Sequence, residues 1–330
     1  MRRVRSAIGV LAAGALAAAT CAQTSGTLGD ATLRKANAAL QAGEADKALA
    51  LLTPLMQQGA GLAEASNLAC RVRLTLEQWN EAAKECEQAV KMEGNNSVYR
   101  LWLGRALGER ADRASFLSAY PLAKRVREEF EEAVRLNPRN AEALSDLGEF
   151  YEEAPSLVGG GEDKAEGVAA QLDKLDPARA HELRARIAEK RKDYGAAERE
   201  FKQAIAARVR PAAQWIALAS FYRRRQRWAE MEYAVRTGQS AAQRDRLAGA
   251  ALFDGASLLI QSGRDPALAA KMLEDYLAGS QKIEEAPAFA ARLRLARLKQ
   301  QLGDSAAAQR EQEAALALAR EYRPAEDAKR

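Results

Sequence analysis

Histidine, cysteine and aromatic residues are scarce in this sequence of 330 residues. The one histidine, His181, excludes a metal site built from several histidines, and a Ser-His-Asp or Cys-His catalytic arrangement would have to use it. Aromatic residues make up only 6%, and long β-branched or alternating runs are missing, whereas 48% of the residues are hydrophobic. This composition suits closely packed helices. We therefore predict an all-α protein that is not an enzyme and needs no cofactor or metal.

The first 22 residues differ in kind from the rest of the chain. Three arginines within residues 2–5 precede an apolar run over residues 7–19, and the small residues of 20–22 follow. The run is too short to span a bilayer, and the whole pattern is typical of a secretory signal peptide. We therefore predict a signal peptide over residues 1–22, no transmembrane span in the mature chain, and an exported protein that is periplasmic or secreted.

The three cysteines leave two questions open. Bacterial lipoproteins are cut just before a cysteine that then carries lipid, so a lipid anchor at Cys21 is an alternative to its removal, although residues 18–20 match such a site poorly. Cys70 and Cys86 then remain as a pair. They could form one disulfide in an oxidising envelope, or they could be two small core residues on facing helices.

The net charge does not indicate nucleic-acid binding. The full sequence carries a formal charge of +5 and has a pI near 9.1, but loss of the three N-terminal arginines lowers that charge by three, to +2. A weakly charged exported chain lacks the basic excess that nucleic-acid binders show. We predict no nucleic-acid partner.

A helical unit recurs along the chain. Phe130, Ala133 and Val134 stand at i, i+3 and i+4, the spacing of one helix face, and Pro138 then ends that helix. The next segment places Leu147-Gly148 and Tyr151 on one face of a following helix. A helix, a proline-containing turn and a second helix form an antiparallel hairpin.

One copy of the unit resembles a known repeat. Residues 215–222 read WIALASFY, which differs from the tetratricopeptide signature W-x₂-L-G-x₂-Y by one methyl group. The chain therefore resembles an exported bacterial tetratricopeptide repeat (TPR) protein, and the resemblance implies an α-solenoid, a right-handed superhelical array of antiparallel helix pairs. With this phase we predict about eight helix pairs over residues 23–320, insertions near 109–122 and 153–164, and a polar tail over 321–330.

The periodic residues have a structural interpretation. In such repeats alanine and glycine let helices approach, while aromatic side chains fill the gap to the next hairpin. We therefore predict core positions for five aromatic residues: Phe130, Tyr151, Phe201, Trp215 and Tyr222.

The resemblance also implies a concave groove lined by the first helix of each pair, where peptide partners bind. Projection of the phase predicts these groove residues: Leu101, Arg105, Glu142, Glu149, Glu152, Arg186, Ile216, Arg223, Arg224, Phe253, Ile260, Leu293 and Arg297. Acidic residues gather in the fourth repeat. The arginine and apolar residues of the last three repeats could hold a segment that bears carboxylates, or the arginines could form a solvated run.

Two functions follow from these features. The first is a scaffold or adaptor that binds other proteins or peptides, with cell-envelope components as the expected partners. The alternative is an accessory solute- or ligand-handling periplasmic protein that partners a transporter binding protein, with a pore or pocket formed by the inserted segments.

Overall fold

The computed structural model describes residues 29–57, 62–244, 248–279 and 282–322. The predicted signal peptide, Cys21 and residues 323–330 lie outside them. Residues 29–41 form the first helix. The helices that follow it are α2 (Ala45–Gln57), α3 (Ala63–Thr75), α4 (Trp79–Met92), α5 (Ser97–Arg113), α6 (Phe116–Leu136), α7 (Ala141–Glu153), the 3₁₀ turn η1 (Ser156–Val158), α8 (Glu162–Leu172), α9 (Pro177–Lys190), α10 (Tyr194–Ala206), α11 (Pro211–Arg224), α12 (Trp228–Ala242), α13 (Gly249–Gln261), α14 (Pro266–Ala278), α15 (Ala288–Gln301) and α16 (Ser305–Leu318).

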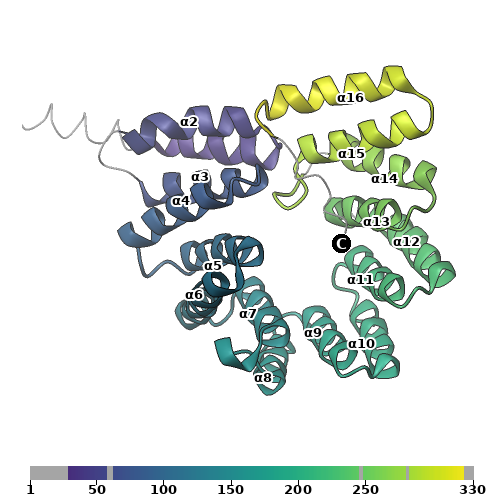
Figure 1. Cartoon of the computed structure of the whole chain (residues 1–330), viewed down its shortest axis with the longest axis horizontal. Helices are drawn as coiled ribbons and strands as arrows, with labels where there is room; N and C mark the ends of the chain where they lie inside the picture. The colour runs from purple at the N-terminus through teal and green to yellow at the C-terminus, as the bar shows by residue number, and fades with distance from the viewer. Residues whose placement is uncertain (1–28, 58–61, 245–247, 280–281, 323–330) are drawn as a thin grey trace, which may run out of the picture.

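The described helices form eight antiparallel pairs arranged around a ring (Figure 1). The first helices α5, α7, α9, α11 and α13 face the centre, and their partners α6, α8, α10, α12 and α14 lie outside. Successive pairs pack against one another as well as within themselves. The all-α solenoid architecture predicted from the sequence is therefore confirmed.

Close helix contacts depend on the small residues of the repeat. Gly148 of α7 faces Leu183 of α9 and Val168 of α8, and a Cβ at this position would overlap Leu183 and lie 3.2 Å from Val168. Gly104 meets the Phe130 ring in the same way. The absence of a side chain therefore permits close contact within a pair at Gly104 and Gly148, and between neighbouring pairs at Gly148.

The aromatic residues of the repeat occupy the expected gaps to different extents. Phe130, Phe201 and Tyr222 are buried. Tyr151 and Trp215 are only partly buried, although both pack against the core. Tyr151 keeps its hydroxyl near the surface, where it donates a hydrogen bond to Glu131 Oε1 at 2.8 Å.

The two inserted segments have different structures. Most of residues 109–122 are helical, because α5 runs on to Arg113 and α6 already begins at Phe116, inside the predicted insertion. Residues 153–164 instead contain the turn η1. Gly159 there has φ of 96°, and a Cβ on Gly160 would overlap the Ala154 carbonyl oxygen, so the turn needs these glycines.

The two ends of the solenoid meet and close the ring at a seam, where α2 lies beside α16 (Figure 1). One hydrophobic cluster combines residues of the first helix, α2 and α3 with Phe289, Ala315 and Tyr322 from the C-terminal part. The Phe289 and Tyr322 rings lie 4.7 Å apart. Tyr322, which we placed in a polar tail, is therefore a buried part of the seam.

Polar contacts also cross the seam. Glu284, in the loop before α15, accepts hydrogen bonds from Gln41 Nε2 at 2.6 Å and from Arg71 Nε at 2.9 Å. The Tyr322 hydroxyl donates to Glu77 at 2.8 Å. These contacts join residues more than 200 positions apart, so the array is a closed ring.

A disulfide links Cys70 of α3 to Cys86 of α4, and both residues are fully buried. The bridge closes a loop of 16 residues, a length for which chain entropy gives a stabilisation of about 3 kcal/mol. We expect the double variant Cys70→Ala/Cys86→Ala to lose about this free energy of unfolding in the N-terminal part of the array. Urea denaturation with and without a thiol reductant measures it. A reductant effect of equal size in parent and variant would contradict this prediction.

Candidate functional site

Helix starts are well defined on the inner face of the ring. The Asn140 side chain caps α7 by accepting from the backbone N–H groups of Glu142 and Ala143. Asp176 caps α9 and is followed by Pro177, and Pro211 opens α11. These fixed starts set which side chains of α7, α9 and α11 point toward the centre of the ring.

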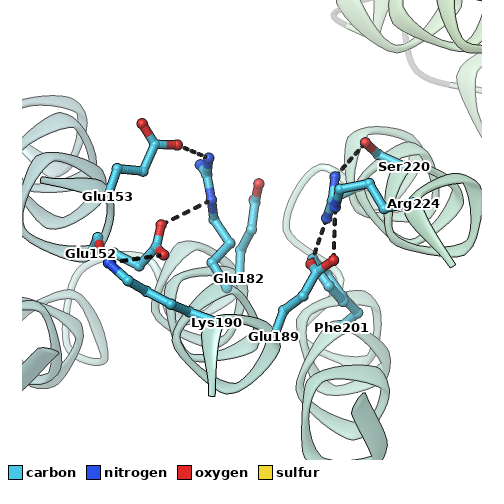
Figure 2. A pocket seen from close by; sticks show the side chains of 10 residues that line it. Glu152, Glu153, Glu182, Glu189, Lys190, Phe201, Ser220 and Arg224 are labelled. Carbon is cyan, nitrogen blue, oxygen red and sulfur yellow. Dashed lines mark hydrogen bonds and ion pairs between the residues drawn. The ribbon is translucent and has the colours of Figure 1, made fainter. Parts of the chain in front are cut away.

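Three successive inner helices and α10 enclose a hollow of about 570 Å³, which we call the inner hollow (Figure 2). Its walls carry charged side chains from α7 and α9 on one side and from α11 on the other. It is lined by Glu152, Glu153, Glu182, Arg186, Glu189, Lys190, Phe201, Ala217, Ser220 and Arg224.

The two arginines of the inner hollow are already held by neighbouring groups. Arg224 donates from Nε and Nη2 to the two carboxylate oxygens of Glu189, at 2.8 and 2.7 Å, and from Nη1 to Ser220 Oγ at 2.8 Å (Figure 2). Arg186 pairs with Glu149 and donates to Glu153 at 2.9 Å. Such bidentate pairing leaves Arg224 few donors for a ligand carboxylate.

Carboxylates, in contrast, exceed their cationic partners. Glu182 has no ion pair among the described residues, and Figure 2 shows its carboxylate without a contact to the other side chains drawn. Glu152 is 7% exposed, and its nearest cationic atoms, Arg186 Nε and Lys190 Nζ, stand at 3.9 and 4.0 Å, longer than a hydrogen bond. Loss of surrounding water raises the pKa of Glu152, and Arg186 and Lys190 oppose that rise.

Two further hollows lie between neighbouring elements of the array. The seam hollow, of about 380 Å³, is lined by residues of both ends of the chain. Within it Trp102 is flanked by Arg71 and Arg105, whose guanidinium carbons lie 5.0 and 4.6 Å from the ring centroid. The insertion hollow, of about 460 Å³, lies between α5, α6, α7 and η1, and the inserted residues Asp112, Pro155 and Val158 line it.

The structure divides the predicted groove residues into four groups. Glu152, Arg186 and Arg224 line the inner hollow, with Glu149 paired to Arg186. Arg105 and Phe253 line the seam hollow, and Arg105 donates to Glu142 at 2.7 Å. Leu293 and Arg297 line a separate hollow between α15 and α16. The fourth group lies in or against the core: Leu101, Ile216, Arg223 and Ile260.

Leu101 and Ile216 are corrections to the predicted groove. Leu101 is 2% exposed, and Ile216 is 5% exposed with its side chain against Gly238 and Gly255. Leu101 belongs to the core cluster of its part of the array, and Ile216 packs against α12 of its own pair and α13 of the next. Ile260 is half-buried against the same core, and Arg223 is half-buried with a buried Nε that lacks a hydrogen-bond partner.

The sequence projection missed several residues of the inner hollow. Glu182 and Lys190 stand four residues on either side of Arg186, and Ser220 stands four before Arg224. An i±4 extension along each inner helix would have found them. The loop that carries Glu284 offered no such signal, because only closure of the ring brings it to Arg71.

The described residues contain no group of three or more His, Cys, Asp or Glu side chains placed to hold a metal ion. Within the same ranges, no helix combines the length and apolar character that a membrane crossing requires.

Asp254, on α13 near the seam hollow, has an altered titration. Its side chain is solvent-accessible, but the protein around it removes much of its water and raises its pKa to about 6, while Arg294 opposes and Glu285 supports the rise. The folded protein then binds this proton more tightly than the unfolded chain. We expect stability to fall as the pH rises from about 4 to 6, and Asp254→Asn to remove this slope. Carboxyl NMR titration measures the midpoint; a value near 4 would contradict it.

Comparison with known proteins gives a likeness of fold. No protein-family model and no curated protein sequence matches the chain. A thermophilic TPR protein from Thermus thermophilus is similar over 58% of this chain and 98% of its own, with 20% identity and a TM-score of 0.48. A TPR protein from Parabacteroides merdae covers 82% of this chain and 98% of its own, with 13% identity and a TM-score of 0.45. MamA covers 50% and 88%, with 18% identity and a TM-score of 0.40.

The class of the protein follows from its own helix pairs. Small residues such as Gly104 and Gly148 lie at the crossings, Phe130 and Phe201 fill the gaps, and each pair packs against the next. The chain is therefore a TPR-like α-solenoid. Solenoids of this kind present an extended concave surface that can bind a partner.

Proposed function

We propose that this protein is a non-catalytic scaffold of the bacterial cell envelope, which binds segments of partner proteins on the inner face of its ring. The inner hollow carries this proposal. It opens on the concave side and presents charged groups from α7, α9 and α11 around about 570 Å³, a volume that side chains of a bound segment can enter.

Site-specific crosslinking in cells tests the binding face. A photoreactive residue at Ser220 lies in the inner hollow, whereas one at Gln203 lies exposed on the outer helix α10 and serves as the control. We expect an adduct with an envelope protein from position 220 and none from position 203. Adducts of equal yield from both positions, or from neither, would overturn the proposal.

Export is the second part of the proposal. Its support is the basic and apolar pattern of residues 1–22 together with the Cys70–Cys86 disulfide, because disulfides persist in oxidising compartments. We expect the full chain in the periplasm or medium, and a chain with polar residues over 7–19 in the cytoplasm. If Cys21 carries lipid, Cys21→Ser will shift the protein from the membrane to the soluble fraction. Retention of the unaltered chain in the cytoplasm would contradict export.

The insertion hollow favours a second candidate, the accessory solute-handling protein. Both inserted segments contribute to its walls, and its volume of about 460 Å³ suits a small molecule. Native mass spectrometry of protein isolated from its envelope would then show an added mass. We expect Ala123→Trp, which fills this hollow, to abolish the added mass, and Ala170→Trp, at an exposed site on α8, to retain it.

A further inference from the structure

Two side chains in and beside the inner hollow carry acceptor oxygens that receive no hydrogen bond from a described residue. Glu152 is nine-tenths buried and lines the hollow, yet its carboxylate accepts no hydrogen bond from a described residue. Its ion pairs with Arg186 and Lys190, at 3.9 and 4.0 Å, leave room for a donor at hydrogen-bond distance. Arg186 cannot serve it fully, because it also holds Glu149 and Glu153.

A second group beside the hollow lacks a donor as well. The Gln214 side chain is 1% exposed and points to Glu182, to which its Nε2 donates weakly at 3.4 Å. Its Oε1 is buried without a partner. The opposite orientation of this amide would set two acceptors against each other, so either orientation leaves an acceptor without a donor.

Electrostatics point in the same direction. Loss of water raises the pKa of Glu149, Arg186 opposes the rise, and the neighbouring carboxylates of Glu182, Asp146 and Glu153 add to it. Negative charge therefore exceeds positive charge on this stretch of the inner face. Arg224, the remaining arginine there, already donates to both carboxylate oxygens of Glu189.

From these observations we propose that the inner hollow binds a basic, extended segment of a partner protein, with a lysine or arginine side chain donating to Glu152 and Glu182. This inference rests on the proposed scaffold function and names the chemistry of its partner. An ammonium or guanidinium group supplies several donors and a positive charge to a site that has acceptors and negative charge in excess. A basic segment agrees with the acidic residues predicted for the fourth repeat, and it differs from the carboxylate-bearing segment that the arginine and apolar residues of the last three repeats could hold.

Fluorescence anisotropy tests this inference with two labelled ten-residue peptides, alternating Ala-Lys and alternating Ala-Glu. We expect the lysine peptide alone to bind, with an affinity that falls as salt rises. Glu182→Gln and Glu152→Gln should each weaken binding about tenfold, since each removes a charged acceptor. Glu313→Gln, the same change at an exposed site on α16, should leave affinity unchanged. Thermal melts check that all variants fold.

Binding of the glutamate peptide, no binding of the lysine peptide, or equal affinity of the Glu182→Gln and parent proteins would overturn the inference. These outcomes are distinct from failure of the scaffold function. Crosslinking at position 220 with an envelope protein, undisturbed by Glu182→Gln, would retain the scaffold and reject the basic segment. Lysine-peptide binding that depends on Glu182, without any envelope adduct, would retain the basic-segment site and reject the scaffold function.

Discussion

Gly148→Trp is expected to lower the free energy of unfolding by about 3 kcal/mol, the upper range for overpacking a close contact. Even a Cβ at this position would overlap Leu183 of α9 and press on Val168 of α8, so the variant strains α7 against its own partner α8 and against the next pair. An array depends on contact between neighbouring pairs. We therefore expect the middle of the ring to loosen, with loss of helical circular dichroism at lower urea.

Gly167→Ala is the matched control for this substitution. Gly167 lies in the exposed part of α8, and a Cβ there meets no atom within 4 Å. Because glycine is a poor helix former, alanine should raise stability by up to about 1 kcal/mol. Equal urea midpoints for Gly148→Trp and the parent protein would show that the assigned repeat phase is wrong.

The repeat could be predicted from the sequence because its signals are local. Ala133 and Gly148 indicate helix crossings because they are small, and Phe130 stands at helical spacing before Ala133. The same residue types recur at matching positions of the other hairpins. One clear copy of the repeat therefore fixes where the helices of the less regular copies begin and end. The inserted residues 109–122 break the rule, because an extra helical turn in α5 and α6 looks like a loop when measured against a compact repeat.

The candidate site was predicted less completely. Arg186 and Arg224 were found because first-helix positions face the concave side, but their partners are set between pairs, as in the contact of Arg224 with Glu189 at 2.7 Å. The sequence therefore suggested acidic residues in the fourth repeat and a mixture of arginine and apolar residues in the last three. The structure shows that Arg186 and Arg224 each pair with a glutamate of the preceding repeat.

Ring closure could not be predicted from any local pattern. It depends on the small rotation between successive pairs, summed over the whole array, which brings Glu284 to Gln41 across 243 positions of sequence. Gly43 also lies at this contact, because a Cβ at that position would be only 2.6 Å from the Ala288 backbone nitrogen. The closed ring fixes the distance between inner helices and so the shape of the inner hollow.

Glu284→Gln is expected to weaken the seam by about 3 kcal/mol. Glu284 and Arg71 have side chains that are only 8% and 18% exposed, and loss of one partner from such a pair leaves a poorly solvated charge. Gln41 would also lose its charged acceptor. We expect the ring to open at the seam while each helix pair stays folded, which gives a larger radius of gyration by X-ray scattering and faster hydrogen exchange in α2 and α16.

Glu285→Gln provides the neighbouring control, because the Glu285 side chain is 62% exposed and its cation, Arg105 Nη1, lies 3.8 Å away. Exposed pairs of this kind contribute about 0–1 kcal/mol, so the radius and the exchange rates should stay close to those of the parent protein. If the ring opens in both variants, closure depends on the combined negative charge of Glu284 and Glu285 and not on the Glu284 pair alone. A closed ring in both would show that the hydrophobic contact of Phe289 with Tyr322 holds the seam without help from Glu284.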